Sequence, residues 1–276
     1  MGMLSINTNI GALKAADAAY SVNKSMETSM ERLSSGKRIN GAIDDAAGLQ
    51  ITQRHTAEIR GFQQAARNAA DGQSLLATAE GAMTEIHNLL QRLREIAVQS
   101  ASGTNSTADH TALNSEVTAL EAEIDRIKND TTWAGTQLLN AASNSGTFTF
   151  QVGPDGGDTI VHTIPSMIHT GTTLGISGDV SSRTAASTYI GKIDTAISNV
   201  GTEREQIGAV MNRLDYTMSN LSNMATNLSL AKGRIEDADF AAESANLART
   251  QVLQQASMSM LAQANASKQN ILALFQ

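Results

Sequence analysis

The 276-residue chain contains no cysteine, two prolines and few aromatic residues, namely five Phe, three Tyr and one Trp. Without cysteine, disulfides and thiolate metal sites are excluded. Buried aromatic side chains usually contribute about 150–250 Å² each to a globular core, so their scarcity disfavours a thick core. The many Ala, Leu, Ile and Met residues favour thin layers of packed helices instead.

Several partner classes are also disfavoured. The net charge is −7 and no basic patch occurs, which argues against nucleic acid. No apolar run approaches the ~20 residues of a membrane span, so we expect no membrane insertion. The N-terminal sequence MGMLSINTNIGALKAADAAY lacks the basic start, continuous apolar run and cleavage site of a secretory signal. Export, if it occurs, is therefore expected to use no cleaved signal peptide.

Apolar residues repeat in alternating steps of three and four in three long segments outside the stretch that holds the two prolines. The first two stripes are Leu76, Ala79, Met83, Ile86, Leu90, Leu93, Ala97 and Leu113, Val117, Leu120, Ile124, Ile127. The third is Ile190, Ile193, Ile197, Val200, Arg204, Ile207, Met211, Leu214, Met218, Leu221, Ala225, Leu228. Such stripes lie on one side of a helix and must be buried. They predict a mainly α fold, an elongated antiparallel coiled-coil or helical-bundle rod.

The residues between these helices predict other structure. The segment SASGTNSTADH (100–110) is typical of a loop between two antiparallel helices. Residues 147–164 alternate with period two on both sides of GPDGG, which predicts one small β-hairpin. The Ser-, Thr- and Gly-rich residues 166–188 predict a surface loop.

Both ends of the chain carry weaker apolar stripes. They consist of Ile6, Ile10, Leu13 and Tyr20 at the N-terminus, and of Met258, Leu261, Ile271, Leu272 and Phe275 at the C-terminus. These stripes hold too little apolar area for either end to pack alone. We expect the ends to gain order against one another or against neighbouring molecules.

Two similar segments lie at matching distances from the ends: ERLSSGKRINGAIDDAAGLQI (31–51) and AKGRIEDADFAAESANLA (231–248). Glycines interrupt a helix in each, and acids precede the alanine-rich restart. Acids at a helix start accept hydrogen bonds from free N–H groups. Asp44, Asp45, Asp237 and Asp239 are therefore predicted to cap helices. We call these two segments the joints. If the two ends of the chain pair, the joints must lie at the same level along the paired helices, which would explain why they are placed symmetrically in the sequence.

These motifs, with INTN (6–9), RNAADGQSLLATAEGAM (67–83) and LQRLREIAVQSASGTNS (90–106), resemble the terminal regions of bacterial flagellin. The resemblance implies a secreted structural subunit that polymerises into the extracellular flagellar filament and serves swimming motility. It implies a terminal helical core domain, 1–44 with 233–276, forming an inner tube. Residues 45–232 would form a rod domain with the hairpin at 147–164 and the loop at 166–188. The large variable insert of many flagellins is absent.

The resemblance also implies partners: identical subunits in a helical polymer, hook-associated junction and cap proteins, and a flagellar export chaperone with the type III export apparatus. Two alternatives remain. One is a hook–filament junction protein, which the long intact terminal motifs disfavour. The other is a non-polymerising coiled-coil binding module, which would show ordered ends in the monomer and no growth on filament ends.

The stretch LQRLREIAVQ resembles the flagellin segment bound by the flagellin-sensing Toll-like receptor, which implies receptor contacts at Arg92, Ile96 and Glu116. Alternatively, Ile96 serves helix packing, and Arg92 and Glu116 form intersubunit ion pairs. No enzyme is expected, because Asp44 and Asp45 have no histidine or nucleophile nearby in sequence. The five histidines are scattered without an HExxH pattern, so we expect no metal site and no cofactor.

Overall fold

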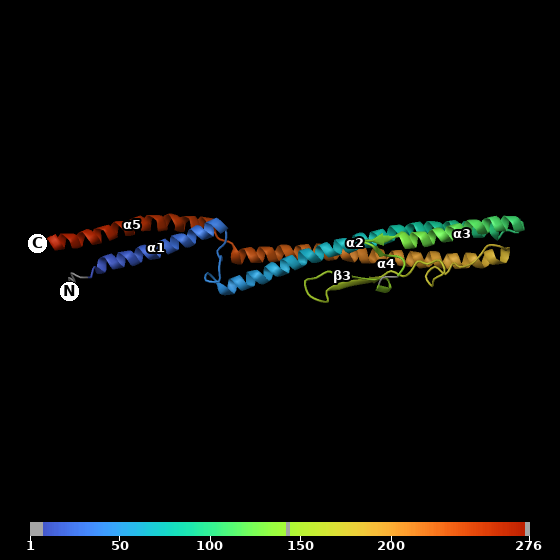
Figure 1. Cartoon of the computed structure of the whole chain (residues 1–276), viewed down its shortest axis with the longest axis horizontal. Helices are drawn as coiled ribbons and strands as arrows, with labels where there is room; N and C mark the ends of the chain where they lie inside the picture. The colour runs from blue at the N-terminus through green and yellow to red at the C-terminus, as the bar shows by residue number, and fades with distance from the viewer. Residues whose placement is uncertain (1–7, 142–143, 274–276) are drawn as a thin grey trace. The chain divides into compact units, whose positions relative to one another are not determined.

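The computed structural model describes residues 8–141 and 144–273 and is mainly helical (Figure 1). Its elements are α1 (Ile10–Ser35), α2 (Ala46–Ser100), α3 (Thr107–Asp130), β1 (Thr132–Trp133), β2 (Thr136–Gln137), a 3-10 turn (Asn144–Gly146), β3 (Thr147–Gln151), β4 (Thr159–Thr163), α4 (Arg183–Glu236) and α5 (Phe240–Ala273). The described residues form two compact units. The terminal unit combines the residues up to Ala57 with those from Asn227 onward, and the central unit is Glu58–Thr226.

The central unit buries the predicted apolar stripe of α2 and buries or partly buries those of α3 and of most of α4. All seven stripe residues of α2 are 0% exposed: Leu76, Ala79, Met83, Ile86, Leu90, Leu93 and Ala97. Residues from α3 and α4, such as Ile124 and Ile193, complete the same cluster. Arg204, the one polar member of the α4 stripe, donates from Nη2 to Glu80 Oε1 on α2 at 2.7 Å. The predicted helical fold is confirmed, and the charge within its stripe is paired.

The predicted hairpin is formed by β3 and β4, which pair antiparallel with Phe150 opposite Ile160. Both side chains are buried, so this face of the hairpin packs into the central core. Phe150 lies so close to α2 that a Cβ atom at Gly72 would come within 2.6 Å of its ring. A larger residue at position 72 would therefore displace the hairpin.

A second, smaller hairpin of β1 and β2 was not expected from the sequence. Its two-residue turn has positive φ angles at Ala134 (48°) and Gly135 (82°), which suits the right-handed twist of paired strands. Each strand has only two residues, which is too short for an alternating pattern to register.

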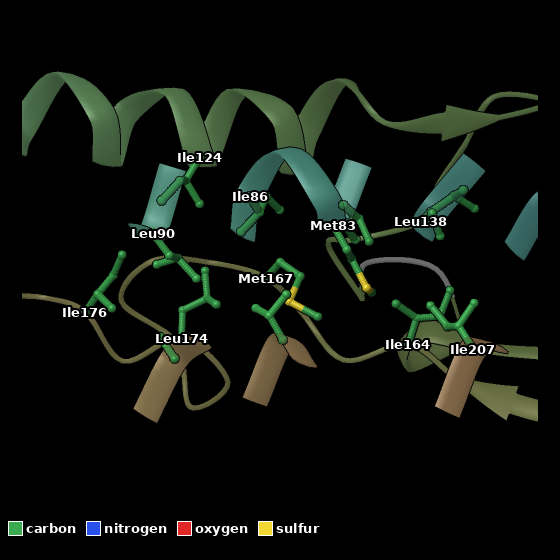
Figure 2. Close-up of a cluster of buried hydrophobic side chains, with 14 of the residues drawn as sticks. Met83, Ile86, Leu90, Ile124, Leu138, Ile164, Met167, Leu174, Ile176 and Ile207 are labelled. Atoms are coloured by element: carbon green, nitrogen blue, oxygen red, sulfur yellow. The ribbon is translucent and has the colours of Figure 1, made fainter. Parts of the chain in front are cut away.

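Residues 166–182 form a loop, as predicted, but the expectation that this loop lies on the surface and extends to residue 188 was wrong. Met167, Leu174, Ile176 and Val180 are buried in the central core, and α4 already begins at Arg183. Figure 2 shows Met167, Leu174 and Ile176 pointing toward Leu90 and other side chains of α2 and α4. The sequence concealed this because these four apolar residues are unevenly spaced among Ser, Thr and Gly, so no helix or strand period appears.

In the terminal unit, α1 and α5 lie side by side and antiparallel (Figure 1). Asn9 caps α1 by accepting from the Ala12 N–H at 3.1 Å, and its amide donates to the Ala264 carbonyl at 3.2 Å, near the end of α5. Helix α1 ends at Gly36, whose φ of 72° is the left-handed conformation that glycine adopts without strain.

Candidate functional site

The contact between α1 and α5 is built mainly from small and polar side chains. The inner face of α1, read from its less exposed positions, is Ala12, Ala15, Ala19, Val22, Met26, Ser29 and Leu33. That of α5 is Glu243, Leu247, Thr250, Gln254, Ser257, Leu261 and Ala264. Both sets alternate steps of three and four, as in a coiled coil. We call these two faces the terminal seam.

Polar contacts cross the terminal seam along its length. Gln254 Nε2 donates to Asn23 Oδ1 at 2.8 Å, and Arg32 pairs with the buried carboxylate of Glu243 at 3.5 Å. Neither contact contributes much net stability, because the first replaces hydrogen bonds to water and the second is offset by the cost of burying the charge of Glu243. The seam therefore sets the register of the two helices more than it stabilises them.

Many of the larger apolar side chains of the terminal unit are exposed rather than packed in the seam. Tyr20 is 74% exposed, and Ile10, Leu13, Val252, Leu253, Met258 and Met260 are also exposed. Among the members of the predicted terminal stripes whose side chains the structure describes, only Leu261 lies in the seam. Ile6 and Phe275 lie outside the described residues, and Ile271 and Leu272 belong to α5 without described side chains. The described part of the predicted stripes is thus a largely outward-facing surface.

A groove of about 580 Å³ opens along the terminal seam. Its lining includes Ala15, Ala18, Leu253, Met260 and Ala264 and is mostly apolar. The groove exists because alanine side chains leave the space between two helices partly unfilled. It can accept apolar side chains from another molecule.

The two joints with similar sequences meet in the folded chain. Arg38 N–H donates to the Glu236 carbonyl at 2.6 Å, and Ala238 N–H donates to the Gly36 carbonyl at 3.0 Å. Lys37 and Asp237 thus form an antiparallel bridge. The symmetry of the sequence follows from this direct backbone pairing.

Of the four acids predicted to cap helices, two do so, one takes part in the backbone bridge, and one closes a turn. Asp45 Oδ1 accepts from the Gly48 N–H at 2.8 Å at the start of α2, and Asp239 Oδ1 accepts from Ala241 N–H at 2.9 Å and Ala242 N–H at 3.1 Å at the start of α5. Both geometries are those of helix caps. Asp237 takes part in the bridge through its backbone instead.

The capping role expected for Asp44 needs correction. Its Oδ2 accepts from the Asn40 and Gly41 N–H groups, each at 3.0 Å, so it closes the turn before α2. The chain doubles back there, which brings these two N–H groups within reach of the carboxylate. They hold the pKa of Asp44 below its ordinary value, because they favour the charged form.

Basic residues also hold the two joints together. The sequence analysis did not identify these residues as functional. Arg38 Nη2 donates to the Ile235 carbonyl at 2.8 Å and lies 3.6 Å from Asp45 Oδ2. Glu236 pairs with Lys37 and Lys232. Burial alone would raise the pKa of Glu236, but the hydrogen bonds and charges of the two lysines outweigh it and lower that pKa. The shared Arg-Ile dipeptides, Arg38-Ile39 and Arg234-Ile235, were the available signal.

On the central unit, α2 and α3 bring two of the three predicted receptor residues together. Arg92 Nη2 donates to Glu116 Oε1 at 2.8 Å, and its Nη1 donates to Glu95 at 2.9 Å. These hydrogen bonds raise the pKa of Arg92. The two side chains thus pair with each other within one chain. Ile96 is 1% exposed and packs in the core, as the packing alternative predicted.

The described residues hold no group of three or more His, Asp or Glu side chains placed to bind a metal ion. A buried histidine–hydroxyl pair joins Ser100 Oγ to His110 Nδ1 at 2.7 Å, and Ser100 also donates to the Val180 carbonyl at 2.8 Å. This pair ties the α2–α3 turn to the segment before α4. None of the described helices combines the length and apolar character that crossing a bilayer requires.

Two family models match the chain: the bacterial flagellin N-terminal helical region at residues 6–144 and the bacterial flagellin C-terminal helical region at residues 190–275. A flagellin of Halalkalibacterium halodurans is 43% identical over 276 residues, covering 98% of this chain and 99% of that protein. Polar flagellin F of Vibrio parahaemolyticus is 46% identical over 172 residues, which are 62% of this chain but only 45% of that longer protein.

Solved structures show the same fold. The crystal structure of Bacillus cereus flagellin superposes with a TM-score of 0.51 at 34% identity, covering 60% of this chain and 94% of that one. A Vibrio parahaemolyticus structure assigned as a flagellar hook-associated protein gives a TM-score of 0.54 at 17% identity, covering 71% and 98%. At that identity the second likeness concerns the fold alone.

Proposed function

Since this chain belongs to the bacterial flagellin family, as a structural and non-enzymatic subunit of the extracellular flagellar filament that serves motility, we propose that it polymerises through the outward apolar faces of its terminal unit. One observation carries the proposal. The terminal helices place Tyr20, Leu13 and Met258 in solvent and keep mainly small or polar groups in their mutual contact. Burial of such side chains between identical subunits would stabilise the polymer at about 25 cal/mol per Å² of apolar surface.

The division of labour we propose assigns residues 1–44 and 233–276 to the inner tube of the filament and residues 45–232 to a surrounding layer. The contrast in packing supports this division, because the central unit has its own core and the terminal unit does not.

We also propose that the subunit leaves the cell through the flagellar export apparatus without a cleaved signal peptide. A chaperone would cover the C-terminal segment before export, and hook-associated junction and cap proteins would contact the subunit at the filament ends. The exposed apolar residues of α5, including Val252 and Met260, support such a chaperone, since they need cover until polymerisation.

We propose that the flagellin-sensing Toll-like receptor contacts two of the three residues that the sequence implied, Arg92 and Glu116. Arg92 and Glu116 are both near half exposed and form a fixed charged pair that a receptor can contact. Ile96 would act indirectly by packing α2.

Seeded growth of the full chain tests the assembly proposal. Short filament seeds are added to monomers carrying Leu13→Asp, and elongation is followed by electron microscopy. Leu13 and Val161 of β4 are about equally exposed, at 58% and 51%, so Val161→Asp is the matched control. We expect the control to elongate and Leu13→Asp to stop growth. Equal growth of both variants would contradict assembly through α1.

A variant lacking residues 1–40 and 236–276 extends the test to both ends. It should remain folded in its central unit but add to no seed. Elongation by this variant would place assembly in the central unit instead.

A further inference from the structure

Among the described residues, Ile43 is an apolar side chain that is fully exposed, at 100%. It lies on the turn between α1 and α2 rather than on either helix. Single exposed apolar residues are common on protein surfaces and need no explanation by themselves. The structure around Ile43 is what distinguishes it.

The turn that carries Ile43 is held by its own hydrogen bonds. The Asp44 carboxylate accepts from two backbone N–H groups, and Asp44 N–H donates to the Gly41 carbonyl at 3.2 Å. Asn40 Nδ2 donates to the Lys37 carbonyl at 3.3 Å. An isoleucine displayed on a braced turn loses little conformational entropy when a partner covers it.

Both sides of the turn are also anchored. On one side Ile39 is buried, and its side chain lies against Gly48, where a Cβ would come within 2.6 Å of Ile39 Cδ1. On the other side Asp45 caps α2. The turn is therefore a fixed projection that presents one β-branched apolar side chain.

From this geometry we infer that the Ile43 turn is an intersubunit contact, in which the Ile43 side chain is buried against a second copy of the chain. The inference rests on self-assembly through the terminal unit, to which this turn belongs. A projection that meets a different surface on the next copy makes a head-to-tail contact, and such contacts generate open helical filaments. Leu230 near the end of α4 and Phe240 at the start of α5 are also exposed apolar residues of the terminal unit.

The first experiment measures the critical concentration for seeded growth of Ile43→Ala, with Val161→Ala as the control. Each added subunit would bury one Ile43 side chain. We expect Ile43→Ala to raise the critical concentration about tenfold, equivalent to about 1.4 kcal/mol per subunit. The control should change it less than twofold. The melting temperature of the Ile43→Ala monomer should equal that of the unmodified chain, because the residue is exposed.

The second experiment uses the absence of cysteine in the chain. Monomer and filament of Ile43→Cys and, separately, Val161→Cys are treated with a maleimide. We expect the thiol at position 43 to react at least tenfold more slowly in the filament than in the monomer, and the thiol at position 161 to react equally in both.

The outcomes separate this contact from assembly itself. An unmodified chain that fails to extend seeds contradicts the proposed assembly. Normal growth of Ile43→Ala, or a thiol at position 43 that stays reactive in the filament, overturns only the inferred contact.

Discussion

The central and terminal units share the same helical spacing, but they differ in which side chains that spacing places in the helix contact. In the central unit, the positions that repeat every three or four residues carry Leu, Ile and Met, and these are buried within the chain. In the terminal unit, the corresponding inner positions carry mainly Ala, Ser, Thr and Gln, and many of the large apolar residues point outward. The difference teaches that helical periodicity locates a seam, while the residues that fill it decide whether the seam is stable alone.

The strongest test of this contrast compares equal truncations in the two units. Leu90→Ala removes a fully buried side chain from the central core and should lower the free energy of unfolding by about 2–5 kcal/mol. Leu13→Ala removes an exposed one and should change it by no more than about 0.5 kcal/mol. Urea denaturation of both monomers measures the difference. Similar losses would mean that the terminal unit has a core of its own.

A smaller effect is expected at the helix cap of α5. Asp239→Ala removes the acceptor for two backbone N–H groups and should destabilise the terminal unit by about 1 kcal/mol. Asp17→Ala, on the exposed surface of α1, is the control. Hydrogen exchange of the first turn of α5 should speed up in the first variant only. Unchanged exchange would show that the joint pairing alone fixes the start of α5.

Filling the groove along the seam should make the terminal unit more stable in the monomer and slow filament growth. Ala18→Leu adds three carbons in the groove that Leu253 also lines; because the groove is open they would be only partly buried, and at about 0.8 kcal/mol per buried CH₂ the terminal pair should gain about 1 kcal/mol of stability. The same variant should extend filament seeds more slowly, because the groove is no longer open to a neighbour. Thermal melting and seeded growth measure the two effects. Faster growth would contradict a role for the groove in assembly.

The smallest effect is a pH dependence of the joint. The pKa values of Asp44 and Glu236 are lowered in the folded chain, from ordinary values of 3.8 and 4.5. Their contribution is therefore complete above about pH 4.5 and is lost as the pH falls through the lowered values. Amide exchange at Arg38 and Ala238, corrected for its intrinsic pH dependence, should be more protected at pH 6 than at pH 3. Equal protection would show that the backbone pairing needs neither carboxylate.

Much of the fold was predictable because the relevant signal is local. The stripe from Leu76 to Ala97 and the alternation around Phe150 each follow from one periodicity, and the structure contains both elements. The buried positions of Met167 and Ile176 were not predictable, since their burial depends on helices far away in sequence rather than on a period.

The candidate site was predictable to a lesser degree. The repeated joints indicated that the two ends pair, but the division of labour among the acids depends on where the chain turns. Asp44 and Asp45 are adjacent, and only the path of the backbone decides that one closes a turn and the other caps α2. Likewise, the outward position of Tyr20 follows from alanines on the opposite face of α1 that pack against α5.

Hydrogen–deuterium exchange of each unit, compared between monomer and filament, tests the central claim most directly. The account predicts that peptides from the central unit, such as the one containing Leu90, are protected in both states. Peptides from α1 and α5 should exchange quickly in the monomer and become protected in the filament. Terminal helices as protected in the monomer as the central core would contradict the claim that their outward apolar faces await burial by other copies of the chain.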